Sequence, residues 1–532
     1  MNGVFALNLH AHIPYCRKSG VWPAGEEWLF EAMNETYIPL LSIFRQFQRE
    51  GLKPRVMIDV VPVLAEQLRD PYMNDRFLAY MDDKIRRADR DVERFAGDAP
   101  KQAVARYYAD TFRRTQDAYK EHFFKDIVGS LKWLQEEGVI EVLASGATHG
   151  FLPLLESDSA VYSQVHLGVK SYEACFGRKP KGFWLPECAY RHREWSSRDN
   201  RERRAIDEWL ADEGIKYFFV ESSGLERARF IDNKHREAAP TTFRGYVLES
   251  GVCVFGRNVA TGKQVWSPDI GYPGDPQYRE FHVKDGESGL HYWRVTRSEP
   301  KDVYRPEKAA EHVRFHAEHF VGLLQDLLGE ARKHVTGCSP VIVSPYDCEL
   351  FGHWWAEGPA WIDATYRRLL NNQDVTCWSL DEYIATYKDT FSKIQLSPTT
   401  WGVNGDYTVW QSPEHAWLWP YINDAARQFE GVMDGLHGRD APAGSRAARI
   451  LAQLGRELLL MEGSDWPFLL FTRQAKEYAN QRFHGHHQRF NKLLWAAKNL
   501  DEPQRISERE LREMEDIDNP WHDIDPAMFA SR

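Results

Sequence analysis

The chain has 532 residues, of which 43% are hydrophobic, and its formal net charge at pH 7 is −11. This length suffices for a large barrel and at least one further domain. The acidic balance argues against nucleic acid or an anionic membrane surface as a partner. Aromatic residues make up 13% of the chain, and 19 of them are tryptophans. Flat aromatic rings suit the faces of sugar rings, so this composition favours a carbohydrate ligand.

The seven cysteines are scattered and show no CxxC spacing. This usage favours a reduced protein over a disulfide framework. The first residues, Met1 to Leu7, lack a basic segment and a cleavage site, so they are typical of a first strand rather than a signal peptide. No apolar run reaches the roughly 18 residues that a membrane helix requires. We therefore expect a cytoplasmic protein that acts as a monomer or a small homo-oligomer.

Apolar runs alternate with helical patterns along the first part of the chain. Helices are predicted at residues 26–49, 199–213 and 307–333. Strands that alternate with helices predict a parallel sheet or barrel. The predicted strands span residues 4–10, 55–60, 139–144, 183–185, 216–220, 252–255 and 341–347.

Three segments depart from this alternation. Residues 71–136 are charged and helical, and they are too long for a simple crossover, which predicts a helical elaboration on the barrel. Residues 222–246 are polar and rich in arginine, which predicts a mobile, lid-like loop. The character of the chain changes near Ser397-Pro398, and from about Asn423 the chain is helical. Its acidic last residues are expected to dock loosely. We therefore divide the chain into a barrel domain, 1–395, and a helical domain, 396–532.

Two predicted strands end at a proline that is followed by acidic residues. Glu187 follows the run Gly182-Phe183-Trp184-Leu185-Pro186, and Asp347 ends the run Val341-Ile342-Val343-Ser344-Pro345-Tyr346. The carboxyl ends of parallel strands form the functional edge of α/β barrels. Two carboxylates there are what glycoside hydrolysis needs, one as nucleophile and one as proton donor. The alternative for Glu187 is an ordinary carboxylate at a helix start.

His10 and His12 lie two residues apart, so on a strand they share one face. They could bind a sugar through hydrogen bonds or supply half of a zinc site, for which His149 and Asp347 are the further candidate ligands. Both interpretations remain open from the residues alone. A second histidine group lies in a predicted C-terminal helix and is expected to be solvated surface: His484, His486 and His487.

Four ordered segments resemble the motifs of glycoside hydrolase family 57, and the nearest match is its α-1,4-glucan branching enzymes. The resemblance implies an α/β fold: an incomplete (β/α)7 barrel with helical insertions and an all-α C-terminal domain that contributes to the active-site cleft. It also implies an enzyme of glycogen-type glucan metabolism that needs no metal or other cofactor. The segments are Leu9–Tyr15, Ala147–Phe151, Gly182–Glu187 and Ser344–Asp347, and residues 263–267, 272–275 and 464–468 extend the match.

The same resemblance implies individual roles. Glu187 corresponds to the nucleophile and Asp347 to the general acid/base of a retaining reaction, and burial beside Trp354 or Trp355 would raise the pKa of the acid. Histidines would line the donor subsite, tryptophans the acceptor path, and one aspartate of the helical domain would help to close the site. For Trp401 and Trp410 the alternative is packing between the domains. The residues implied in substrate binding are His10, His12, His149, Trp266, Trp354, Trp401, Trp410 and Asp465.

These expectations describe a 1,4-α-glucan branching enzyme that cleaves α-1,4 bonds and forms α-1,6 branches in amylose- or glycogen-type glucans. In the branching enzymes that the chain resembles, a loop places a tyrosine over the cleft, where it would shield the intermediate from water. Residues 225–243 contain no tyrosine, so some hydrolysis is expected. An α-amylase or 4-α-glucanotransferase of the same family is the alternative, since acceptor positioning and water exclusion separate the outcomes. A metal-dependent carbohydrate deacetylase or mannosidase that uses His10, His12 and Asp347 is a further alternative.

Overall fold

The computed structural model describes residues 3–196, 200–267, 269–296, 298–436, 442, 444–499 and 506–532. An open parallel barrel forms its centre, and the strand order is β11-β1-β2-β3-β4-β7-β10. Beyond β10 the sheet continues through the antiparallel β9 (Tyr246–Val247). The predicted incomplete (β/α)7 barrel is therefore confirmed. Its strands are β1 (Gly3–Ala11), β2 (Val56–Val60), β3 (Ile140–Ser145), β4 (Gly182–Trp184), β7 (Tyr217–Val220), β10 (Cys253–Gly256) and β11 (Val341–Asp347).

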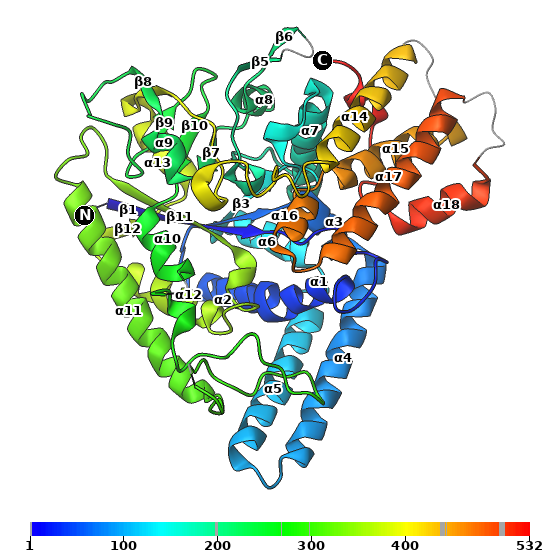
Figure 1. Cartoon of the computed structure of the whole chain (residues 1–532). Helices are drawn as coiled ribbons and strands as arrows, with labels where there is room; N and C mark the ends of the chain where they lie inside the picture. The colour runs from blue at the N-terminus through cyan, green and yellow to red at the C-terminus, as the bar shows by residue number, and fades with distance from the viewer. Residues whose placement is uncertain are drawn as a thin grey trace.

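The barrel strands are buried almost throughout, because helices cover the outside and side chains fill the inside. The longest covering helix, α11 (Pro306–Ala331), runs along the left of Figure 1. The other covering helices are α1 (Glu26–Ala32), α2 (Ile38–Arg49), α3 (Pro62–Arg69), α6 (Ile127–Glu136), α7 (Asp158–Phe176), α8 (Ile206–Asp212), α10 (Val259–Trp266), α12 (Gly358–Leu369) and α13 (Leu380–Tyr387).

The charged insertion that follows β2 forms a helical hairpin. Its two long helices, α4 (Pro71–Arg94) and α5 (Ala99–Asp117), pack against each other and project downward in Figure 1. Each helix begins at an aspartate whose side chain accepts a hydrogen bond from a backbone N–H of the first turn, Asp70 for α4 and Asp98 for α5. The caps stabilise the starts of the two helices, and each helix buries apolar side chains such as Phe77 and Phe112, so a polar stretch can still be helical.

The C-terminal helices lie on the right of Figure 1, beside the carboxyl ends of the barrel strands. Contrary to expectation, the acidic end of the chain is firmly anchored. Arg449 pairs with Glu508 and Glu515, and the Tyr15 hydroxyl donates to Asn519. The helices are α14 (Leu418–Gly435), α15 (Arg446–Met461), α16 (Asp465–Thr472), α17 (Lys476–Lys498) and α18 (Glu508–Ile517).

Residues 222–246 differ from the lid-like loop that the sequence predicts. The Arg244 side chain is fully buried and pairs with Glu237 at 2.6 Å, so this arginine is not a solvated loop charge. The Phe243 carbonyl accepts a hydrogen bond from the N–H of Val341, which places the segment's far end beside the amino-terminal start of β11. The segment contains α9 (Ser222–Glu226) and β8 (Arg229–Asp232), and β8 pairs with β13 (Lys393–Gln395).

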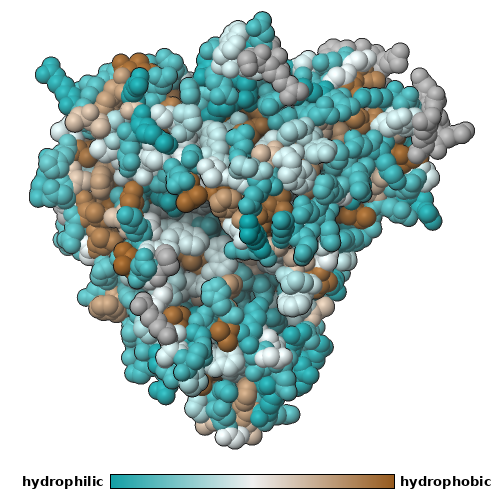
Figure 2. Space-filling model, in the orientation of Figure 1, coloured by the Kyte–Doolittle hydropathy of each residue, from teal (hydrophilic) through white to brown (hydrophobic). Residues whose placement is uncertain are grey.

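The face of the molecule in Figure 2 is largely hydrophilic, with a hollow near its middle and apolar residues among those at the rim. In Figure 1 this position lies between the barrel and α16. Among the described residues, no helix is both long and apolar enough to cross a membrane.

Candidate active site

A cavity of about 1240 Å³ lies where the carboxyl ends of the barrel strands meet the C-terminal helices. Its lining comes from segments far apart in the sequence, including β1, the turn after β4, the end of β11 and the start of α16. All ten residues predicted for the site line this cavity: His10, His12, His149, Glu187, Trp266, Asp347, Trp354, Trp401, Trp410 and Asp465.

Glu187 lies in a tight turn that directly follows β4. Its φ of 62° is in the left-handed region, which non-glycine residues seldom adopt and which is concentrated at functional sites. One carboxylate oxygen accepts a 2.7 Å hydrogen bond from the indole Nε1 of Trp401, and the other accepts a 2.9 Å bond from the hydroxyl of Ser464. Because both oxygens have a donor, the carboxylate is fixed in position and its ionised form is stabilised.

Three histidine rings form a stack beside Glu187. The ring centroid of His149 lies 4.9 Å from that of His10 and 4.2 Å from that of His12. Burial lowers the pKa of His10, but Asp59, whose Oδ2 lies 2.5 Å from His10 Nδ1, outweighs it and raises that pKa to about 9. Burial, together with the other two histidines, holds the pKa of His149 well below its usual value. The stack therefore combines a charged and a neutral imidazole at neutral pH.

Asp347 ends β11 and lies opposite His10 in the β1–β11 ladder. Burial raises the pKa of Asp347 to about 6, against the opposing charge of His10. Burial also raises the pKa of Glu187 to about 7, against its hydrogen bonds from Trp401 and Ser464. The two values lie close together, and the higher pKa falls on Glu187 even though its hydrogen bonds lower it, so the pKa values do not assign the roles. Donors fix both oxygens of the Glu187 carboxylate, which suits a nucleophile held in position for attack. No donor among the described residues reaches the Asp347 carboxyl, which leaves that group free to pass a proton.

The activity is expected to show a bell-shaped dependence on pH, with its maximum between about 6 and about 7. Glu187 must lose its proton to attack and Asp347 must keep its own, so the active pair carries a single proton. Activity therefore falls below about pH 6, where both carboxyls are protonated, and above about pH 7, where neither is. Measuring kcat/KM on amylose from about pH 4 to about pH 9 gives both limbs, whose apparent values belong to the pair. A profile without an acidic limb would contradict the pairing.

The four predicted tryptophans have different surroundings. Trp266 and Trp354 are both more than one-third exposed, with ring centroids 5.9 Å apart, as suits residues that flank a sugar chain. Trp410 is only 1% exposed and stacks on Phe151 at 4.7 Å, so packing dominates its surroundings. Trp401 contacts the carboxylate of Glu187 directly, a role that the sequence did not indicate.

Substituting Trp401 with Phe is expected to lower transfer and hydrolysis together, by about 10- to 100-fold. This is the order expected when a buried carboxylate loses one hydrogen-bond donor. Both activities should fall because both use the same intermediate on Glu187. Single-turnover measurement of the first step tests this. Trp410→Phe is the matched control, because the Trp410 indole nitrogen has no hydrogen-bond partner among the described residues. A normal first step in Trp401→Phe would show that the bond is dispensable.

The sequence did not identify three residues that shape the site. Asp59 holds His10, and the Ser464 hydroxyl contacts both Glu187 and Nδ1 of His149, the latter at 2.8 Å. Arg257 follows β10 directly, lines the cavity and pairs with Glu221 at 2.6 Å. Two of them have a sequence signal: Asp59 lies within a predicted strand that pairs with β1, and Arg257 comes at a strand end.

The geometry does not support a zinc site on His10 and His12. The Nε2 of His12 lies 2.9 Å from Asp465 and is therefore already engaged. The imidazole rings stack rather than converge on one point. Among the described residues, these histidines and Asp347 do not form a group whose ligand atoms lie together.

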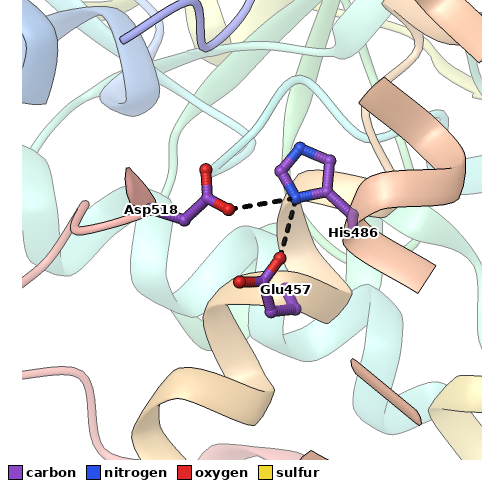
Figure 3. Close-up of side chains that lie close together, drawn as sticks. All are labelled: Glu457, His486 and Asp518. Carbon is purple, nitrogen blue, oxygen red and sulfur yellow. Dashed lines mark hydrogen bonds and ion pairs between the residues drawn. The ribbon is translucent and has the colours of Figure 1, made fainter. Parts of the chain in front are cut away.

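One buried group of potential metal ligands lies in the described part of the helical region, at Glu457, His486 and Asp518 (Figure 3). Arg489 contacts both carboxylates, with Nε 3.0 Å from Glu457 and a terminal nitrogen 2.6 Å from Asp518. Because the carboxylates already have a cationic partner, this arrangement fits an ion-pair network better than a metal site. The prediction that His486 is solvated is wrong, because its side chain is fully buried.

Comparison with known proteins gives an independent result. Residues 6–395 match glycosyl hydrolase family 57, and residues 423–529 match the C-terminal domain of 1,4-alpha-glucan branching enzymes. The chain is 43% identical over its full length to a 1,4-alpha-glucan branching enzyme of Thermococcus kodakarensis, and the alignment covers 79% of that protein. A family 57 branching enzyme of Pyrococcus horikoshii superposes with a TM-score of 0.92 at 40% identity, over 100% of this chain and 97% of that one. The α-amylase AmyC of Thermotoga maritima superposes with a TM-score of 0.86 at 28% identity, over all of both chains.

Proposed function

The chain belongs to glycosyl hydrolase family 57 and is a 1,4-α-glucan branching enzyme of that family, and we propose that it acts by a retaining transfer through Glu187 and Asp347. The observation that carries this mechanism is the pair of partly buried carboxyls, both with raised pKa values, at the strand ends of one cavity. Each titrates near neutral pH, and their hydrogen-bond surroundings differ, which is the pattern of an acid–nucleophile pair.

In the first step, the Glu187 carboxylate attacks the anomeric carbon of a glucose unit within the chain. The bond to the leaving O4 breaks, and Asp347 gives its proton to that oxygen. The product is a glycosyl ester on Glu187 and a shortened glucan that leaves. In the second step, the 6-hydroxyl of another glucan gives its proton to Asp347 and attacks the same carbon, which frees Glu187 and forms the α-1,6 branch.

The outcome of the second step depends on which hydroxyl reaches the intermediate. Water gives hydrolysis, a 4-hydroxyl gives disproportionation and a 6-hydroxyl gives a branch. None of the described residues in 222–246 lines the cavity, which supports an intermediate that this segment leaves open to water. We therefore propose that hydrolysis accompanies branching. Trp266 and Trp354 are the residues best placed to hold the acceptor chain.

Proton NMR of amylose after incubation tests the function, and a reducing-end assay on the same samples measures hydrolysis. New signals from 6-linked glucose are expected, together with a smaller rise in reducing ends. Reducing ends without 6-linked signals would instead identify an α-amylase. A changed chain-length distribution without either signal would identify a 4-α-glucanotransferase. A chelator is expected to leave the rate of amylose conversion unchanged. Loss of activity in chelator would instead support the alternative of a metal-dependent carbohydrate deacetylase or mannosidase.

A further inference from the structure

A cluster of rings lies on α14 and α17 outside the cavity. Trp417 and His484 stack with their centroids 5.2 Å apart and their planes 12° apart, and Tyr421 lies 6.0 Å from Trp417 and 4.9 Å from His487. Tyr421 is 46% exposed, and His484 is exposed as well. We call these four residues the outer aromatic face. None of them lines the catalytic cavity.

The outer aromatic face continues the wall of the cavity. The first turns of α17 line the cavity with Glu477, Tyr478 and Gln481. Residues three or four apart are neighbours on the surface of a helix, so His484 follows Gln481, and His487 follows His484, in a row that winds around α17. α14 and α17 contact each other, and in Figure 1 they lie side by side and lead away from α16. A chain that leaves the cavity along α17 therefore meets these rings.

The chemistry of the outer aromatic face suits an uncharged polyhydroxyl chain. Ring faces can pack against the C–H face of a sugar, while the Tyr421 hydroxyl and the imidazole nitrogens can bind sugar hydroxyls. Arg473, which precedes α17, pairs with Glu414 at 3.0 Å. The surroundings include exposed amide side chains, Gln488 and Asn491, which can donate and accept hydrogen bonds.

We propose that the outer aromatic face binds the part of an α-1,4-glucan chain that extends out of the cavity along α17. This inference rests on the proposed function, because it assigns the same substrate class to a second surface. Such a site would raise the affinity for long glucans without contacting the reacting atoms, since a second contact on one chain adds to the first.

The test compares the double variant Tyr421→Ala/His484→Ala with the wild type. Native electrophoresis in gels that contain amylose measures binding, and kinetics on amylose and on a short maltooligosaccharide separate KM from kcat. The double variant is expected to lose most of its retardation, and its KM for amylose is expected to rise about three- to ten-fold, the order expected for ring contacts of this kind. KM for the short substrate, which ends within the cavity, should change much less.

Two further variants sharpen the test. Phe315→Ala removes another exposed ring, on α11, and is expected to match the wild type. Tyr421→Phe, combined with wild-type His484, keeps the ring and is expected to keep the retardation. Equal loss on short and long substrates, or loss in Phe315→Ala as well, would indicate a general effect on the fold and overturn the inference.

The inference and the proposed function fail in different ways. If the wild type binds and branches amylose but the double variant does so equally well, the outer aromatic face has no role and the function stands. If the wild type neither binds nor modifies amylose, the proposed function itself fails, and the inference fails with it.

Discussion

Glu187→Gln is expected to abolish glycosyl-enzyme formation, with a loss in kcat of at least about 1000-fold, while glucan binding persists. An amide has no negative charge with which to attack the anomeric carbon. The variant keeps the volume of the side chain, and its amide oxygen can still accept a hydrogen bond from Trp401 or Ser464. Turnover of amylose and calorimetric binding of a maltooligosaccharide measure the two effects separately.

Ser464→Ala is the graded companion to this variant. It removes one of two donors from the carboxylate but leaves the nucleophile, so a loss of about 10- to 100-fold is expected. The result that identifies the nucleophile is a much lower residual turnover in Glu187→Gln than in Ser464→Ala. If Glu187→Gln kept a large share of the wild-type turnover, another residue would have to form the intermediate.

Asp347→Asn is expected to slow the first step on amylose by about 100- to 10,000-fold, the range typical of losing a positioned general acid. An aryl glycoside with a good leaving group should lose far less in that step, because its leaving oxygen departs without a proton. The descending, basic limb of the pH profile should also disappear, since the group whose proton it reports is gone. Pre-steady-state kinetics with both substrates gives the comparison.

Glu349→Gln provides the matched control, because Glu349 is a buried carboxyl only two residues from Asp347. Its Oε1 accepts hydrogen bonds from the Tyr37 hydroxyl and from the N–H of His12, so it supports the wall of the site. The control should lose activity equally on amylose and on the aryl glycoside. An Asp347→Asn variant that behaved in the same way would mean that Asp347 is not the acid.

The strands and the ends of the strands could be predicted from the sequence because their signals are local. An apolar run that stops at a proline marks where a strand ends, and the parallel arrangement then brings those ends to one edge. For this reason Glu187, Asp347 and His10 were predicted from residues alone, and all three line the cavity. His12 and His149 were also candidates from residues alone, with their chemistry left open, and the resemblance to family 57 added the tryptophans and Asp465.

Two segments outside the barrel strands were predicted incorrectly from the sequence. Residues 199–213 were expected to be one helix, but the structure has β6 (Arg201–Arg203) followed by α8. Residues 222–246 were expected to be a loop because they are polar, yet β8 finds a partner in β13 more than 150 residues later. Strand pairing over such a distance depends on which segments the tertiary fold brings together, and the composition of one segment does not determine this.

The sequence by itself determined the barrel, the strand-end carboxylates and the helical character of the C-terminal part. Only the tertiary structure decided what each side chain does there. Trp401 and Trp410 are the same residue type nine positions apart, yet one donates to Glu187 and the other stacks on Phe151. His486 is buried rather than solvated because Glu457 and Asp518 converge on it from other segments. Hydrogen-bond partners and burial are set by residues remote in sequence, so they follow from the packing of the whole chain.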